Sequence, residues 1–115
     1  MSQFVYLYRR PDPLPPSPQQ MQERLERWTA WFRSLQEGKH LVERGLPLEY
    51  SGGAVVRNKK GNVTDGPYAE SKDLVTGSMI FEAASLEDAI DVARTCPTYE
   101  FGGSVEVRPV QDPRV

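Results

Sequence analysis

The residues best suited to chemistry lie in one short polar stretch between two strand-like segments. It begins with Asp65, which Gly66 and Pro67 follow directly. This tripeptide is first of all a turn former, because the aspartate side chain can bond the nearby backbone while glycine and proline set the dihedral angles. The alternative is that the turn presents Asp65 at the mouth of a cleft, as a general base or a ligand acceptor. The two interpretations are compatible.

Further along the same stretch, Glu70 and Lys72 are two positions apart. In an extended loop they point the same way, so they form an ion pair that orders the loop, or one faces a ligand and the other faces water. We take Glu70, Lys72 and the nearby Tyr68 as candidate substrate-binding residues.

Three candidates lie outside this stretch. His40, the single histidine, follows a predicted helix end, where the helix dipole favours its charged form. It is either a satisfied residue there or an acid/base catalyst together with Asp65. Arg108, on a predicted strand, either pairs with Glu82 or holds a substrate carboxylate through two hydrogen bonds. Tyr6 is a further candidate for substrate binding.

Several kinds of chemistry lack their usual sequence pattern. The chain has no cysteine and histidine spacing typical of a metal site, no glycine-rich phosphate loop that opens a helix, and no nucleophile elbow. We therefore expect no metal and no cofactor. Cys96 is the single cysteine, so it cannot form an internal disulfide, and we expect it to be buried and structural rather than a reactive thiol.

The composition limits the partners. The formal net charge is -2 and the basic residues are scattered among acidic ones, which argues against nucleic acid and anionic membranes. No run approaches the roughly 18 apolar residues of a membrane span, and the N-terminal apolar run is too short for a signal peptide. We expect a cytoplasmic protein.

The 115 residues predict one domain over 1–115. Residues 4–8 predict a central strand, with Val5 and Leu7 on one face and three aromatic residues on the other. A proline-rich loop over 9–18 leads to a helix that begins with a capping box at Ser17 and ends at Gly38. Its apolar stripe consists of Met21, Leu25, Trp28, Phe32 and Leu35, with Trp31 at the edge.

The second half predicts further strands and a helix. We expect an irregular segment over 41–50, a hairpin formed by 53–57 and 62–64, and a strand over 77–83. Ser85 then caps a helix that ends before Pro97. The last elements are a strand over 104–109 and a flexible tail over 111–115.

The order strand, helix, hairpin, strand, helix, strand predicts an α+β, ferredoxin-like β-α-β-β-α-β fold with an antiparallel sheet. Both helices cover one face of the sheet. The other face is expected to display Phe4, Tyr6, Tyr8, Ile80, Glu82, Glu106 and Arg108. Such a face is too apolar at its centre to be left in water, so we expect a homodimer.

Three motifs follow one another along the chain: the run from Val63 to Asp73, Ser85-Leu-Glu-Asp-Ala-Ile and Val105-Glu-Val-Arg-Pro. Through them the chain resembles the YCII-related family, in the branch named for its Asp-Gly-Pro-Phe motif. The resemblance covers Phe4 to Val110. The chain departs from the branch pattern at Tyr68, Ser71 and Asp73, where Phe, Thr and Glu are usual.

This resemblance implies a ferredoxin-like fold that dimerises as an α/β barrel, and a function that is largely uncharacterised. Members of the family occur beside or fused to sigma factors, and distant relatives with the same barrel include muconolactone isomerase and a dehydrochlorinating enzyme. The wider group has a His–Asp pair proposed as a catalytic dyad. His40 lies after the first predicted helix rather than inside it, so the dyad histidine does not carry over to this position.

Two functions follow as hypotheses. The first is a cofactor-free homodimer that binds an organic small molecule, with a possible proton-transfer isomerisation or elimination by Asp65 and His40 and with Arg108 as the carboxylate anchor. The second is a non-catalytic interaction module, for example one that tunes a sigma factor. An interior filled by side chains would favour the second hypothesis.

Overall fold

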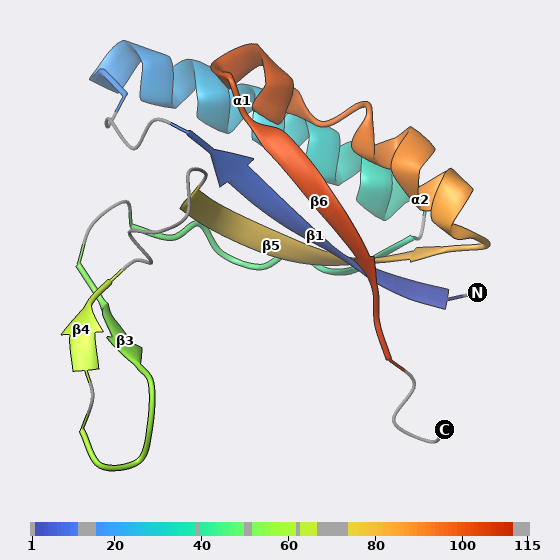
Figure 1. Cartoon of the computed structure of the whole chain (residues 1–115). Coiled ribbons are helices and arrows are strands. Elements are labelled where there is room, and N and C mark those ends of the chain that lie inside the picture. Colours follow the sequence, from blue (N-terminus) through green and yellow to red (C-terminus); the bar gives the residue numbers. More distant parts are fainter. Residues whose placement is uncertain are drawn as a thin grey trace.

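The chain folds as a four-stranded antiparallel sheet with two helices on one of its faces (Figure 1). The computed structural model describes residues 2–11, 16–38, 40–49, 52–61, 63–66 and 74–111. The helices are α1 (Pro18–Glu37) and α2 (Leu86–Ala93), and a short 3-10 helix, η1 (Pro97–Phe101), follows α2. In the described part, no helix is long and apolar enough to cross a membrane.

The sheet has the strand order β2-β5-β1-β6. Its strands are β1 (Ser2–Arg10), β2 (Leu41–Glu43), β5 (Leu74–Ala83) and β6 (Ser104–Pro109). All neighbours are antiparallel, and β1 lies between β5 and β6 as the sequence predicts for a central strand. With α1 and α2 as the two crossovers, this is the ferredoxin-like arrangement, so the predicted fold class is confirmed. The sheet of the single chain is open and not a closed barrel.

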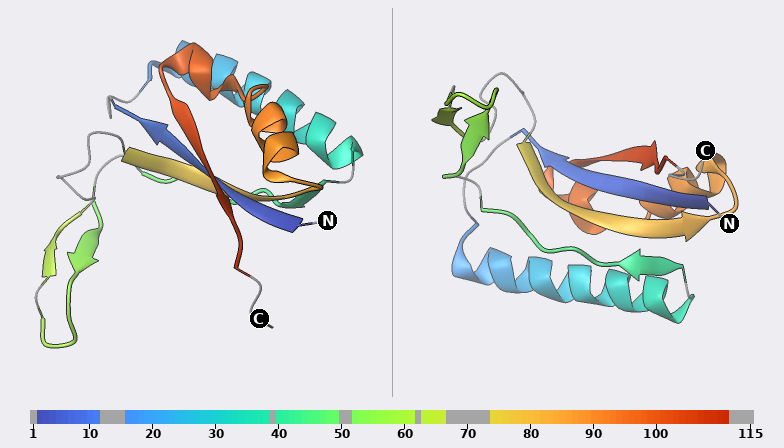
Figure 2. Two further views of the ribbon diagram at one scale, coloured as in Figure 1. Left: turned by 45° about the vertical axis from the view of Figure 1, so that its right-hand side comes forward. Right: turned by 90° about the horizontal axis from the view of Figure 1, so that it is seen from below.

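The predicted hairpin forms, but it does not join this sheet. Strands β3 (Ala54–Val56) and β4 (Val63–Asp65) pair only with each other and project from the body of the molecule (Figure 2). The second strand of the main sheet is instead β2, in a segment predicted to be irregular. Its three residues are too few to show the alternation of a strand, and a bulge interrupts its pairing with β5.

The two faces of β1 are opposite to the prediction. Phe4, Tyr6 and Tyr8 face the helices and are buried, whereas Val5 and Leu7 lie on the open face and are half-buried. The strand carries apolar residues on both sides, so its alternation alone cannot decide which side meets the helices. The predicted open-face positions of Ile80, Glu82, Glu106 and Arg108 agree with the register of β5 and β6.

Both helices begin where the sequence predicts. Ser17 and Gln20 form the reciprocal capping box of α1, and the Ser85 hydroxyl accepts a hydrogen bond from the backbone N–H of Asp88 at the start of α2. The predicted proline-rich loop over 9–18 is shorter than expected, because β1 continues through Arg10 and α1 begins at Pro18. Residues 12–15 and 112–115 lie outside the described part.

The core is dense beneath the middle of the sheet. Tyr6, Met79 and Phe81 are almost completely buried there, and the small side chains Ala89 and Ala93 let α2 pack closely. Cys96 is buried as predicted, and burial raises the pKa of its thiol to about 12. A thiol that stays protonated is a poor nucleophile, which supports a structural role.

Candidate functional site

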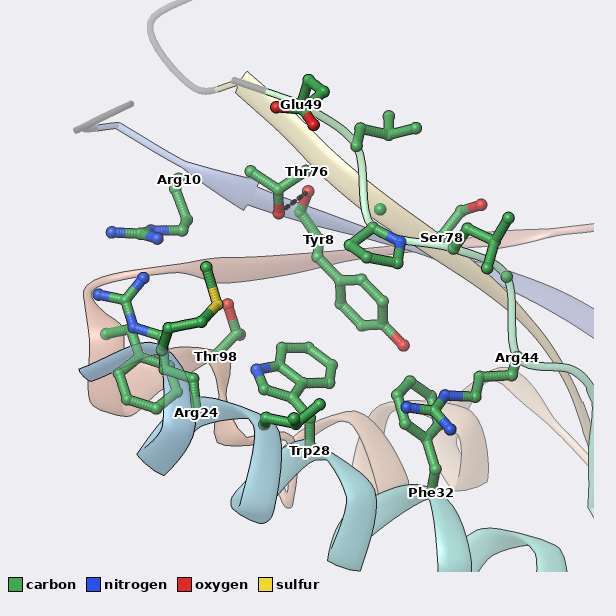
Figure 3. A pocket seen from close by; sticks show the side chains of 18 residues that line it. Tyr8, Arg10, Arg24, Trp28, Phe32, Arg44, Glu49, Thr76, Ser78 and Thr98 are labelled. Carbon is green, nitrogen blue, oxygen red and sulfur yellow. Dashed lines mark hydrogen bonds between the residues drawn. The ribbon is translucent and has the colours of Figure 1, made fainter. Parts of the chain in front are cut away.

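A cavity of about 380 Å³ lies at the other end of the sheet from α2, beside the N-terminal half of α1 (Figure 3). Its walls come from α1, from the adjoining ends of β1 and β5, from η1 and from the segment 44–49, which follows β2. The volume is in the range of pockets that bind organic molecules.

The α1 wall is formed by residues three or four positions apart. Its members are Met21, Arg24, Leu25, Trp28 and Phe32. The sequence predicts the apolar ones as core stripe, and Phe32 is buried, but Met21 and Leu25 are 51% and 60% exposed. The first half of α1 therefore presents its apolar side to the cavity rather than to a packed core.

The segment 44–49 forms the wall opposite α1. The backbone N–H of Leu48 donates to the carbonyl oxygen of Thr76 at 2.9 Å, which ties this segment to β5. Gly45 has a φ of 72°, and a Cβ at this position would clash with the carbonyl oxygen of Ser78. This glycine therefore permits the close approach that holds the wall in place.

Tyr8 extends from β1 into the space between these walls. Its ring packs edge-to-face on Trp28, with the centroids 4.7 Å apart. The hydroxyl is buried and has no hydrogen-bond partner among the described residues. Burial raises the pKa of Tyr8 above its usual value, with smaller contributions from Cys96 and Tyr6, while Arg44 acts in the opposite direction. The side chain is therefore a neutral hydrogen-bond donor at physiological pH.

Arginine dominates the charge of the cavity wall. Arg10, Arg24 and Arg44 contribute to it, and Glu49 is the one acidic residue in the described lining. The guanidinium of Arg24 stacks on Phe101 at 4.6 Å from the ring centroid, and that of Arg44 stacks on Phe32 at 4.4 Å. Within the described part, the Nε and Nη1 atoms of Arg24 are buried and make no hydrogen bond. The cavity thus combines aromatic walls with hydrogen-bond donors.

The residues predicted from sequence lie elsewhere. Asp65 is exposed at the end of β4, where it pairs with Ala54 in the projecting hairpin. His40 is half-buried before β2, with its ring 5.6 Å from that of Phe81, and its Nδ1 has no hydrogen-bond partner in the described part. No contact in the described part joins Asp65 to His40, and neither lines the cavity.

Arg108 lies on the open face of the sheet, where its Nε is 4.0 Å from a carboxylate oxygen of Glu106. That carboxylate is closer to Arg9, at 2.9 Å. Tyr6 is fully buried and its hydroxyl donates to the carbonyl oxygen of Ala89, so it is part of the core. The remaining candidates, Tyr68, Glu70 and Lys72, lie outside the described residues.

The cavity residues were missed because they are spread along the chain. Tyr8 is in β1, Arg24 is in α1 and Arg44 follows β2, and only the tertiary fold brings them to one cavity. One local signal was present, since Arg24, Trp28 and Phe32 follow each other at spacings of four and share one side of α1. Within the described residues, no group of three or more acidic, histidine or cysteine side chains could hold a metal ion.

Two comparisons bear on the identity of the chain. The sequence model of the YCII-related domain family matches residues 1–113. An uncharacterized protein of Rhizobium meliloti (strain 1021) is 40% identical over 60 residues, which are 50% of this chain and 48% of that protein. The chain therefore spans about half the length of this curated relative.

Proposed function

We propose that this chain, which belongs to the YCII-related domain family, binds a small organic molecule with an apolar body and an oxygen acceptor in the cavity between α1 and the sheet. The observation that carries the proposal is the Tyr8 hydroxyl. It is withdrawn from water and has no partner among the described residues. Leaving such a group unpaired costs about 1–3 kcal/mol, and a ligand oxygen that accepts its hydrogen bond removes this cost.

The position of Arg44 explains how a ligand can reach this hydroxyl. Arg44 is exposed, stacks on Phe32 and lies close enough to Tyr8 to influence its titration. We infer that this long side chain covers the hydroxyl at the surface. Such a side chain changes rotamer readily, so it can turn aside and then contact the bound molecule.

The walls of the cavity favour an apolar, flat ligand body. Tyr8, Trp28 and Phe32 supply aromatic surface, and Met21 and Leu25 supply flexible aliphatic surface that is largely exposed without a ligand. Burying such side chains stabilises a complex by about 25 cal/mol for each Å² of apolar surface that is removed from water. A cavity of this kind supports ligand binding over the alternative of an interaction module with a filled interior.

Filling the cavity tests this proposal. Leu25→Trp adds bulk to an exposed wall position, and the matched control Leu86→Trp makes the same change at an exposed position of α2. Isothermal titration with a panel of small aromatic acids, alcohols and ketones measures the affinity. We expect Leu25→Trp to weaken binding at least about tenfold, since about 1.4 kcal/mol of lost contact has that effect.

The control variant is expected to bind as the wild type does. If no compound of the panel binds, or if both tryptophan variants bind equally well, the cavity is not the ligand site. Circular dichroism confirms that each variant is folded before the titration.

We also propose that a bound carbon acid undergoes proton exchange, the first step of an isomerisation or elimination without cofactor. In this proposal neutral Tyr8 donates a hydrogen bond to the oxyanion that develops when a base removes a proton from the adjacent carbon. Glu49 lines the cavity and is a base of suitable chemistry. The abstracted proton passes to its carboxylate, and a solvent proton returns to the carbon.

Deuterium incorporation from heavy water into a bound ketone, followed by mass spectrometry, tests this step. We expect Tyr8→Phe and Glu49→Gln to abolish it. Asp65→Asn and His40→Gln change the acid/base candidates predicted from sequence. If exchange depends on these two residues and not on Tyr8 and Glu49, the base has been misassigned.

A homodimer formed through the open face of the sheet completes the proposal. Val5, Leu7 and Ile80 form an apolar centre on that face. Glu82 on β5 and Arg108 on β6 lie on opposite sides of β1, so a two-fold axis in the interface and parallel to β1 brings Glu82 of one copy toward Arg108 of the other.

Sedimentation analysis of the wild type, of Leu7→Lys and of the control Leu86→Lys tests the dimer. We expect the wild type and the control to be dimers and Leu7→Lys to be a monomer, because the lysine would bury a charge in the interface. A wild type that sediments as a monomer at all concentrations contradicts the proposed interface.

A further inference from the structure

The two stacked arginines lie at opposite ends of the cavity, with Trp28 between them (Figure 3). Arg24 is on α1, and Arg44 stacks on Phe32, which is eight residues further along the same helix. Since an α-helix rises 1.5 Å per residue, the two ends are about 12 Å apart. The intermediate position on this side of the helix is Trp28, whose ring packs on Tyr8.

Both guanidinium groups are held in the same way. The Cζ atom of each lies over an aromatic ring, 4.6 Å from the centroid for Arg24 and 4.4 Å for Arg44, and in the described part neither makes an ion pair with a carboxylate. A ring occupies one face of a guanidinium and leaves the N–H groups at its edge able to donate, and the buried Nε and Nη1 of Arg24 have no partner in the described part. These edges match the oxygens of a carboxylate.

From this geometry we infer that the ligand is a planar organic diacid, with one carboxylate held by Arg24 and the other by Arg44 together with the Tyr8 hydroxyl. The inference deepens the ligand-binding part of the proposed function and depends on it, and it does not concern the exchange step. A hydrogen bond takes up about 3 Å at each end, which leaves roughly 6 Å for the ligand. A benzene ring with acid groups in para positions has this length, and its flat face can lie against Trp28.

The charge of the two stacked arginines agrees with a dianion. In the described part neither Arg24 nor Arg44 makes an ion pair with a carboxylate. Two carboxylates of a ligand can offset these two positive charges, whereas a neutral ligand cannot.

Titration calorimetry with three probes of similar shape tests the inference. The probes are terephthalate with two acid groups, benzoate with one, and neutral 1,4-benzenedimethanol. We expect terephthalate to bind wild type at least about tenfold more tightly than benzoate. The hydrogen bonds of its second carboxylate contribute more free energy than a tenfold difference in affinity requires. Isophthalate, with its acid groups in meta positions, is expected to bind less tightly than terephthalate.

Arg24→Gln and Arg44→Gln are each expected to reduce the affinity for terephthalate about tenfold or more, while the affinity for the neutral diol changes less than about twofold. Arg24→Lys and Arg44→Lys keep the charge but lose the planar fork, so intermediate affinities are expected. Arg94→Gln removes the same charge from an exposed position outside the cavity and serves as the control. Thermal melts establish that all variants are folded.

The outcomes separate the two proposals. The diacid inference is overturned, and the ligand site stands, if the diol binds wild type as tightly as terephthalate does. The same conclusion follows if Arg24→Gln and Arg44→Gln change the affinities for terephthalate and for the diol by the same factor. If none of the probes binds wild type, both are overturned. A loss of terephthalate affinity in Arg94→Gln equal to that in the cavity variants would show a general effect of charge and would also overturn the inference.

Discussion

Tyr6 and Tyr8 are two residues apart on β1, face the same side of the sheet and are both buried, at 0% and 5% exposure. Their hydroxyl groups differ completely. That of Tyr6 donates to the carbonyl oxygen of Ala89, and that of Tyr8 has no partner in the described part of the chain. Since local sequence and burial are alike, the difference must come from the helix opposite each tyrosine.

The helix opposite Tyr6 is built from small residues. Ala89 and Ala93 let the backbone of α2 approach the sheet closely enough for its carbonyl oxygen to accept from a tyrosine. Opposite Tyr8, α1 presents the large side chain of Trp28, whose ring meets that of Tyr8 edge-on. A bulky residue holds a helix away from a sheet. One end of this sheet is therefore a filled core, and the other end retains a cavity.

The largest expected effect is the loss of core packing at the Tyr6 end. Phe81 is 1% exposed and stacks on Tyr6, with the ring centroids 5.6 Å apart. We expect Phe81→Ala to lower the free energy of unfolding by about 3–5 kcal/mol. The matched change Phe101→Ala, at a half-buried residue of the cavity wall, is expected to cost less than about 2 kcal/mol. Urea denaturation measures both, and equal losses would mean that the two ends are packed alike.

A second effect concerns the fall of the free energy of unfolding at alkaline pH. Burial raises the pKa of Cys96 from 9.0 to about 12, so the folded state keeps a proton that the unfolded chain loses. The stabilisation is complete below pH 9 and is lost as pH rises from 9 to 12, by about 1.4 kcal/mol per pH unit. The raised pKa values of Tyr6 and Tyr8 act in the same direction above pH 10.

Urea denaturation between pH 9 and 10 isolates the thiol from the tyrosines. We expect Cys96→Ala to show a shallower decline of unfolding free energy over this interval than the wild type. Identical slopes would indicate that solvent reaches the thiol in the folded protein, and that this part of the interior is less closed than the burial of Cys96 suggests.

A smaller effect is expected from the Tyr6 hydroxyl alone. Tyr6→Phe keeps the ring and removes the hydrogen bond to Ala89, which should lower the free energy of unfolding by about 1 kcal/mol. The measurement is the midpoint of urea denaturation. The slope of unfolding free energy against urea concentration should stay the same, because it reports the surface that unfolding exposes. A variant as stable as the wild type would mean that this hydrogen bond makes no net contribution.

Most of the fold could be predicted from local signals. The capping residues Ser17 and Ser85 define the starts of both helices, because a side-chain oxygen there satisfies backbone N–H groups that the helix leaves free. The side of β1 that meets the helices could not be predicted. Both sides are apolar, and tertiary contacts distinguish them, such as that of Tyr6 with α2 and that of Tyr8 with α1. The strand β2 was missed because its three residues acquire their role from β5.

The site could be predicted far less well than the fold. Asp65, His40 and Arg108 are suited to chemistry by residue type, but the fold places them in the hairpin, beside β2 and on the open face of the sheet. A cavity exists only where elements fail to fill the space between them, and that depends on side-chain volumes such as that of Trp28 opposite Tyr8. No pattern along the chain encodes it directly.

The smallest expected loss of stability, and the sharpest test of the comparison, is that of Tyr8→Phe. Because the hydroxyl has no partner among the described residues, its removal gives up no hydrogen bond and relieves the desolvation of a polar group. We expect the free energy of unfolding to stay within about 0.5 kcal/mol of wild type or to rise. Urea denaturation beside Tyr6→Phe measures the contrast. If Tyr8→Phe loses as much stability as Tyr6→Phe, the hydroxyl is already satisfied in the folded protein, and no ligand oxygen is needed to explain its position.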